Sequence, residues 1–147
     1  MPIIRGYPNI VSYEATQKIV DQMRKNICQI QSDESQGTGF LCKIPFPDIN
    51  NMLPVLITNN HIINEEFLYE KGASISIYTE DNKSTKTINL NDRIKYTNKT
   101  FGITIIEIKE EDKINNYLEL DEIIINDIIN NINKNKIYIN ETIYIIQ

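Results

Sequence analysis

Short segments in which apolar and polar residues alternate make up most of the chain between residues 27 and 109. The clearest one runs from Ser74 to Tyr78 as Ser-Ile-Ser-Ile-Tyr. A period of two turns one face of a strand toward a core and the other toward solvent, which is typical of antiparallel sheets. The chain is therefore expected to fold mainly as antiparallel β-structure.

About six such strands are expected, each bounded by turn residues. The segments 27–31 and 38–44 flank a polar turn at 32–35 and predict a hairpin. The other candidates are 52–58, 74–78, a looser pair at 86–90 and 94–96 that is counted as one, and 103–108. Six short antiparallel strands suit one closed all-β unit, so we predict a six-stranded β-barrel over residues 27–109.

The segment that precedes the barrel has a different period. Ala15, Ile19 and Met23 recur at helical spacing, and Ser12 is a suitable N-cap. We therefore predict an amphipathic helix over residues 12–27, which takes up most of an amino-terminal segment, 1–26.

Two regions follow the barrel. Residues 110–140 are charged and then rich in Asn and Ile, a composition that predicts a polar connector without regular structure. Residues 141–147 are again apolar and predict one more strand.

Composition excludes several classes of partner. The length of 147 residues suits one domain with one sizeable core. A net charge of -5 gives no basic stripe for nucleic acid, and no apolar run approaches the roughly 20 residues of a spanning helix. The first residues lack the features of a secretory signal, so a cytoplasmic location is expected.

The cysteines and the histidine make a bound metal or other cofactor unexpected. Cys28 and Cys42 lack the spacing of a metal site, and His61 is the single histidine of the chain. Because stable disulfides are rare in the cytoplasm, the two cysteines are expected to be free buried thiols.

Three short strings follow one another in the sequence. They are Gly37-Thr38-Gly39-Phe40, Thr58-Asn59-Asn60-His61 and Gly102-Ile103-Thr104-Ile105-Ile106. This order resembles the amino-terminal half of a trypsin-like (chymotrypsin-fold) serine peptidase. In that family a G-[ST]-G-F strand precedes a T-x-x-H turn with the general base, and a D-[IL]-[AT]-[LIV]-[LIV] strand with the orienting acid follows.

The resemblance implies a fold and a role for His61. Residues 27–109 would be the first barrel of the peptidase, and 141–147 the opening strand of a second barrel that is missing from this chain. His61 would be the catalytic base, raised above the barrel rim by a turn that Thr58 is expected to cap. Gly37 and Gly39 would allow backbones to approach closely near the same rim.

Glycine occupies the position of the acid. Gly102 can neither orient an imidazole nor stabilise imidazolium, and loss of that acid costs such peptidases about 10⁴ in turnover. Asp92, Glu107 and Glu110 are carboxylates that could substitute, but no spacing argument supports any of them.

The nucleophile is also missing, because no serine of the chain stands in the G-[DN]-S-G setting of the family. We therefore expect a trypsin-like peptidase domain that is truncated and catalytically inactive as it stands. One alternative is a pseudo-peptidase that binds a peptide or protein partner. Another is an unrelated small α+β protein whose Ile-rich composition imitates the motifs. The oligomeric state is left open.

Overall fold

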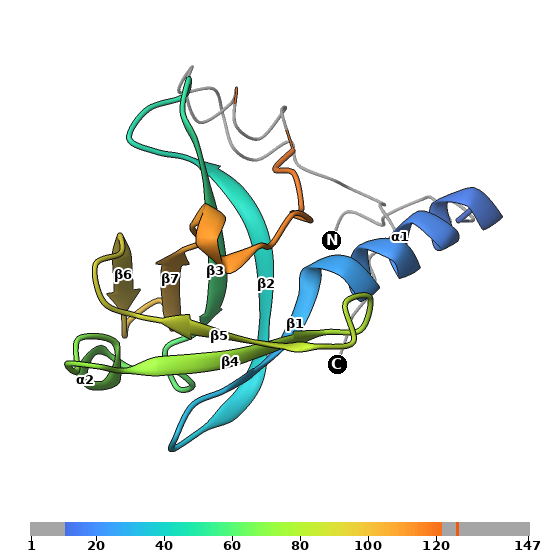
Figure 1. The fold of residues 1–147 in the computed structure, drawn as a ribbon. Helices are drawn as coiled ribbons and strands as arrows, with labels where there is room; N and C mark the ends of the chain where they lie inside the picture. The colour runs from blue at the N-terminus through green and yellow to red at the C-terminus, as the bar shows by residue number, and fades with distance from the viewer. Residues whose placement is uncertain (1–10, 122–125, 127–147) are drawn as a thin grey trace, which may run out of the picture. The chain divides into compact units, whose positions relative to one another are not determined.

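The computed structural model describes residues 11–121 and residue 126. The chain divides into two compact units, one of residues 24–119 and one of residues 1–23 and 120–147. The unit of residues 24–119 contains the described strands, and the candidate site lies within it (Figure 1).

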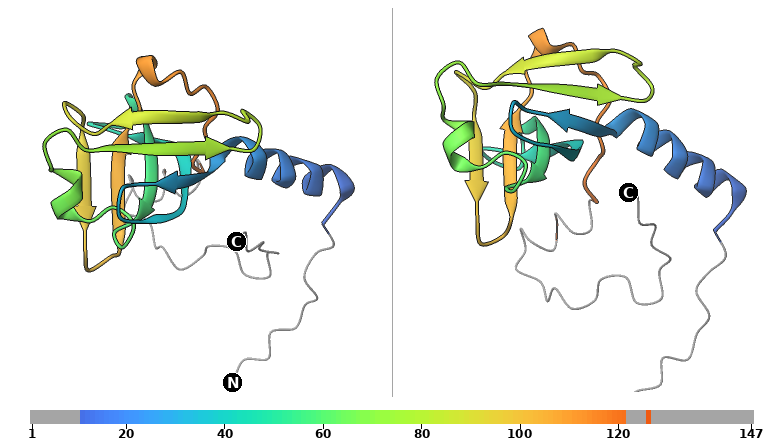
Figure 2. Two further views of the ribbon diagram at one scale, coloured as in Figure 1. Left: turned by 60° about the horizontal axis from the view of Figure 1, so that its bottom comes forward. Right: turned by 90° about the horizontal axis from the view of Figure 1, so that it is seen from below.

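Seven antiparallel strands form one sheet, in the order β5-β4-β1-β2-β3-β7-β6. The strands are β1 (Ile27–Gln31), β2 (Gln36–Pro45), β3 (Met52–Asn59), β4 (Ser74–Thr79), β5 (Thr85–Asn89), β6 (Lys95–Asn98) and β7 (Ile103–Glu107). The sheet curls into a half-barrel, with β4 and β5 lying across the direction of β2 and β3 (Figures 1 and 2). The prediction of a mainly antiparallel β-fold is therefore confirmed.

The two edge strands of the curled sheet, β5 and β6, follow one another directly in the sequence. β5 pairs with β4, and β6 pairs with β7. Between them the N–H of Leu90 donates to Ala73 at 2.9 Å, and the carbonyl of Ile94 accepts from Glu107 N–H at 2.9 Å. The sheet therefore has seven strands and is a half-barrel, where a closed barrel of six strands was predicted, and the two strands expected to form a looser pair do not pair with each other.

The predicted helix and first hairpin are both present. Helix α1 spans Tyr13–Asn26, and Ser12 Oγ caps it by accepting from Ala15 N–H at 3.1 Å. β1 and β2 pair directly, and Ser32 Oγ accepts from Ser35 N–H at 3.0 Å in the turn between them. Serine, which favours helix caps and turns, therefore marks both the start of α1 and the turn between β1 and β2.

The core consists of the inward-facing side chains of the strands and of apolar residues from two connections. Isoleucine and leucine dominate it, as the alternation predicts. The fully buried members with the largest side chains include Ile30, Leu41, Leu56, Ile63, Leu68, Ile75, Ile88, Leu90 and Ile106.

Two short helical turns lie in stretches that the sequence predicts to be irregular. Helix α2 (Glu65–Leu68) begins at Asn64, whose Oδ1 accepts from Phe67 N–H at 2.9 Å. The 3₁₀ helix η1 (Glu110–Asp112) follows β7, and beyond it Leu118 forms an isolated bridge with Cys42. The strand predicted at 141–147 lies outside the described residues.

A buried ion pair attaches η1 to the bend between β5 and β6. Arg93 Nη1 lies 2.5 Å from Asp112 Oδ2, and Arg93 Nη2 donates to Oδ1 at 2.8 Å. The two side chains are 3% and 5% exposed. Arg93 also donates to the carbonyl of Asn89 at 2.5 Å and to that of Glu107 at 3.1 Å. The guanidinium thus joins three separate segments of the half-barrel.

The pKa values of this pair favour the charged forms. Burial by itself raises the pKa of Asp112, but hydrogen bonds from Arg93 and from Lys109 N–H, together with the positive charges, outweigh burial and lower it. The hydrogen bond to Asp112 raises the pKa of Arg93. Both groups are therefore ionised at neutral pH.

Candidate functional site

His61 lies on an exposed turn that begins where β3 ends. Asn59 caps this turn, since its Oδ1 accepts from His61 N–H at 2.7 Å and its carbonyl accepts from Ile62 N–H at 3.0 Å. Thr58, which the sequence predicts as the cap, instead donates from Oγ1 to the carbonyl of Thr38 at 2.9 Å and links β3 to β2. The tendency of Asn to form such turns is the signal that would have identified Asn59.

The two residues after His61 attach the turn to the barrel. Ile63 is fully buried in the core. Ile62 fills the space beside Gly37, where an added Cβ would overlap Ile62 Cδ1. A close approach of another backbone was expected at Gly37, but its close neighbour is this side chain; the backbone approach is at Gly39, where an added Cβ would lie 2.9 Å from the Ile57 carbonyl oxygen. The imidazole is thus carried by an exposed turn whose next two residues are held by packing.

A buried chain of hydrogen bonds holds the same turn from its other side. Asn60 Nδ2 donates to Thr97 Oγ1 at 2.6 Å, and Thr97 Oγ1 lies 2.8 Å from Thr104 Oγ1. Thr104, which is fully buried, donates to the carbonyl of Ile63 at 2.7 Å. This chain connects the His61 turn to β6 and β7, so the turn is fixed at both ends.

We expect Thr104→Val to lower the free energy of unfolding by about 1–3 kcal/mol, because it leaves the Ile63 carbonyl without its hydroxyl partner in a buried place. Urea unfolding followed by circular dichroism measures the change. Thr104→Ser is the matched control, since it keeps the hydroxyl. If valine is tolerated as well as serine, the hydroxyl does not hold the turn.

Residue 102 lies next to the His61 turn. β3 and β7 pair with Asn59 opposite Ile103, and the Gly102 carbonyl accepts from Asn60 N–H at 3.0 Å. Gly102 has φ +67, and no atom lies within 4 Å of where its Cβ would be. The structure therefore places Gly102 beside Asn60, the residue before His61, with open space where a side chain at 102 would begin.

The carboxylates considered as substitutes lie elsewhere. Glu107 pairs with Val55 near the far end of the β3–β7 ladder, and its Oε2 accepts from Ile94 N–H at 2.9 Å. Glu110 begins η1, and the carbonyl of Asp92 accepts from Lys109 Nζ at 2.6 Å. None of the three substitutes lines the depression around His61.

Two other carboxylates share that depression. Glu65 and Glu66, in the first turn of α2, line it together with His61 and Lys99. Sequence reasoning missed both because the stretch was expected to be an irregular connector. The signal was Asn64 followed by two acidic residues, a pattern that favours a helix start.

No serine or cysteine lines the depression around His61 among the described residues. Cys28 and Cys42 are free and buried, as the sequence predicts. Burial raises the pKa of Cys28 to about 12 and that of Cys42 to about 11. Both thiols are therefore protonated at neutral pH and are poor nucleophiles.

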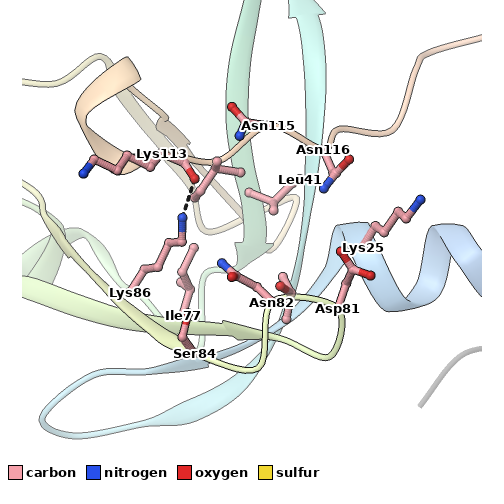
Figure 3. A pocket seen from close by; sticks show the side chains of 12 residues that line it. Lys25, Leu41, Ile77, Asp81, Asn82, Ser84, Lys86, Lys113, Asn115 and Asn116 are labelled. Atoms are coloured by element: carbon pink, nitrogen blue, oxygen red, sulfur yellow. Dashed lines mark hydrogen bonds between the residues drawn. The ribbon is translucent and has the colours of Figure 1, made fainter.

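A second hollow, shown in Figure 3, is lined by three lysines, but their ammonium groups do not point toward one common place. Lys86 Nζ donates to the carbonyls of Lys113 and Asp112. The side chain of Lys113 points away from Asn82 and the rest of the hollow (Figure 3). This arrangement does not form an anion site.

The described part of the chain contains no cluster of three His, Cys, Asp or Glu side chains that could hold a metal ion. Within the same residues, no helix has the length and apolar character needed to cross a membrane.

Comparison of the chain with protein families, with curated proteins and with solved structures finds no match. Any assignment of function therefore rests on the geometry around His61.

Proposed function

We propose that residues 24–119 are the base-bearing part of a trypsin-like serine peptidase, with His61 as the general base. The observation that carries this proposal is the hydrogen bond of 3.0 Å between Asn60 N–H and the Gly102 carbonyl. In such a peptidase the acid must contact the base, so the two positions must be neighbours in space. They are 41 residues apart by number, and nothing but the fold brings them together.

The chain is proposed to be inactive by itself. It offers a base without the orienting acid, and the depression around His61 has no nucleophile among its described lining residues. Acyl transfer by such a peptidase needs the nucleophile within hydrogen-bond reach of the base, and the base in turn oriented by the acid. A nucleophile would have to come from another polypeptide segment.

We expect the purified chain to leave casein and a panel of fluorogenic peptides uncut over a day. The measurement compares it with His61→Ala. Turnover by the natural chain that disappears in His61→Ala would overturn the inactive assignment, whereas turnover unchanged in His61→Ala would indicate a contaminating peptidase.

A carboxylate restored at position 102 tests the geometry without requiring activity. We expect the NMR titration midpoint of the His61 ring to lie about one pH unit higher in Gly102→Asp than in Gly102→Asn, because a nearby negative charge stabilises imidazolium. Asn and Asp are the residues that best tolerate the left-handed backbone at this position, so the two variants differ mainly in charge.

The single histidine of the chain makes this titration easy to assign. Equal midpoints in the two variants would mean that residue 102 does not face the imidazole, and the proposal would fail. Neither variant is expected to cleave peptides, since the nucleophile is still missing.

A second candidate is the pseudo-peptidase that binds a peptide or protein partner. The open depression around His61 favours it, because its amide, carboxylate and ammonium groups can hydrogen-bond a peptide, while no nucleophile is among its described lining residues. Binding of peptides that are not cleaved, lost in Lys99→Ala or Glu66→Gln, would support this candidate.

A further inference from the structure

The outer face of β4, β1 and β2 carries six polar side chains that are all uncharged. Gln29 lies between Thr38 of β2 and Tyr78 of β4, and Gln31 lies between Gln36 and Ser76 in the same way. The register therefore makes two parallel rows of three residues. We call these six residues the neutral face.

The neutral face lines a shallow hollow on the sheet. All six residues border it, and Thr85 of β5 extends the row beyond Tyr78. Its volume of about 590 Å³ lies in the range of ligand sites. β1 pairs with both β2 and β4, and β4 pairs with β5, so the floor of the hollow is regular sheet.

The hydrogen-bonding groups of the neutral face are unused. Within residues 11–121, none of its six side chains donates to or accepts from another protein group. At the His61 turn, by contrast, the side chains of Asn59 and Asn60 both form hydrogen bonds with other protein groups. Amide and hydroxyl groups both donate and accept, so the face offers both kinds of bond to a ligand.

The absence of charge is the unusual property. Charged residues make up 24% of the chain, close to the usual share of about 25%, so six neighbouring surface side chains without a charge depart from the chain's own average. Thr and Tyr are common on strands for reasons of propensity alone. Glutamine is not a preferred strand residue, so Gln29, Gln31 and Gln36 call for another explanation.

We propose that the neutral face binds an uncharged oligosaccharide. An anionic ligand would select Arg or Lys, and an apolar partner would select several aromatic or other apolar side chains, of which this face has only Tyr78. A sugar chain is neutral and rich in hydroxyls, and its C–H surfaces pack on an aromatic ring such as that of Tyr78. Partly open β-barrels of another class use a sheet face in this way. This proposal does not depend on a peptidase role for His61.

The experiment is an NMR titration of the ¹⁵N-labelled full chain with neutral hexasaccharides of glucose and of N-acetylglucosamine, each up to about 10 mM to reach weak binding. We expect shifts at Gln29, Gln31 and Tyr78 with one of them. Tyr78→Ala should weaken that binding at least tenfold. Tyr96→Ala, which removes an exposed tyrosine from β6, should leave it unchanged.

Gln31→Glu is a second variant that keeps the size of the side chain and adds a charge. It should weaken binding of the hexasaccharide, and it provides the test if Tyr78→Ala fails to fold. The proposal is overturned if neither hexasaccharide shifts these residues, if only a sulfated hexasaccharide binds, or if Tyr78→Ala and Gln31→Glu both fold and bind like the natural chain.

Discussion

Replacing Arg93 by alanine is expected to lower the free energy of unfolding by about 3–5 kcal/mol, since the change leaves Asp112 buried without its partner. The Asp112 side chain is only 5% exposed in the folded chain, so the guanidinium takes the place of most of its hydration. The change also removes the hydrogen bonds to the carbonyls of Asn89 and Glu107. Urea unfolding followed by circular dichroism measures the loss.

Arg24→Ala is the matched control. Arg24 forms a pair with Glu80 at 3.9 Å, but these side chains are 42% and 64% exposed. Exposed pairs contribute at most about 1 kcal/mol, so this variant should remain close to the natural stability. If Arg93→Ala is no more destabilising than Arg24→Ala, the buried pair does not hold η1 to the barrel.

The same pair gives a pH dependence with a definite sign. Because the pKa of Asp112 is lowered in the folded state, its contribution to stability is complete above the ordinary carboxyl value near 3.8. That contribution is lost as the pH falls through the lower, folded value. Asp112→Asn should therefore be less stable than the natural chain at pH 7, and the difference should shrink below about pH 4.

Sequence reasoning found most strands because a local pattern determines them. Alternating residues such as those from Ser74 to Tyr78 face the core whatever their partners are. The segments 86–90 and 94–96 were expected to pair with each other, but they form the two opposite edges of the sheet, which a local pattern does not show. The pairing of Arg93 with Asp112 was missed for the same reason, since it joins residues 19 apart across that bend.

The candidate site was predicted less completely than the fold. The motif order placed His61 and Gly102 near each other, and the structure does the same. The cap was assigned to Thr58 instead of Asn59, because both residues favour turns and only the pairing of β3 with β2 decides between them. The contact of Ile62 with Gly37 required knowledge of the strand register.

Gly39→Ala is expected to destabilise the half-barrel by about 1–3 kcal/mol through overpacking. Gly39 is buried, and an added Cβ would lie 2.9 Å from the Ile57 carbonyl oxygen and 2.5 Å from Ile30 Cδ1. The backbone has little freedom to yield, since Gly39 pairs with Cys28 on one side and Thr58 on the other. Urea unfolding again provides the measurement.

Gly37→Ala serves as the comparison because its added Cβ would meet only the side chain of Ile62. Removing that side chain in Ile62→Ala should therefore make Gly37→Ala nearly neutral, a coupling that a double-mutant cycle measures. Gly39→Ala should cost the same with or without Ile62→Ala, because its contacts are a backbone carbonyl and the core. If Gly37→Ala and Gly39→Ala show the same coupling energy with Ile62→Ala, this side of the half-barrel relaxes around either added Cβ. The contact between Gly37 and Ile62 would then not be what fixes the His61 turn.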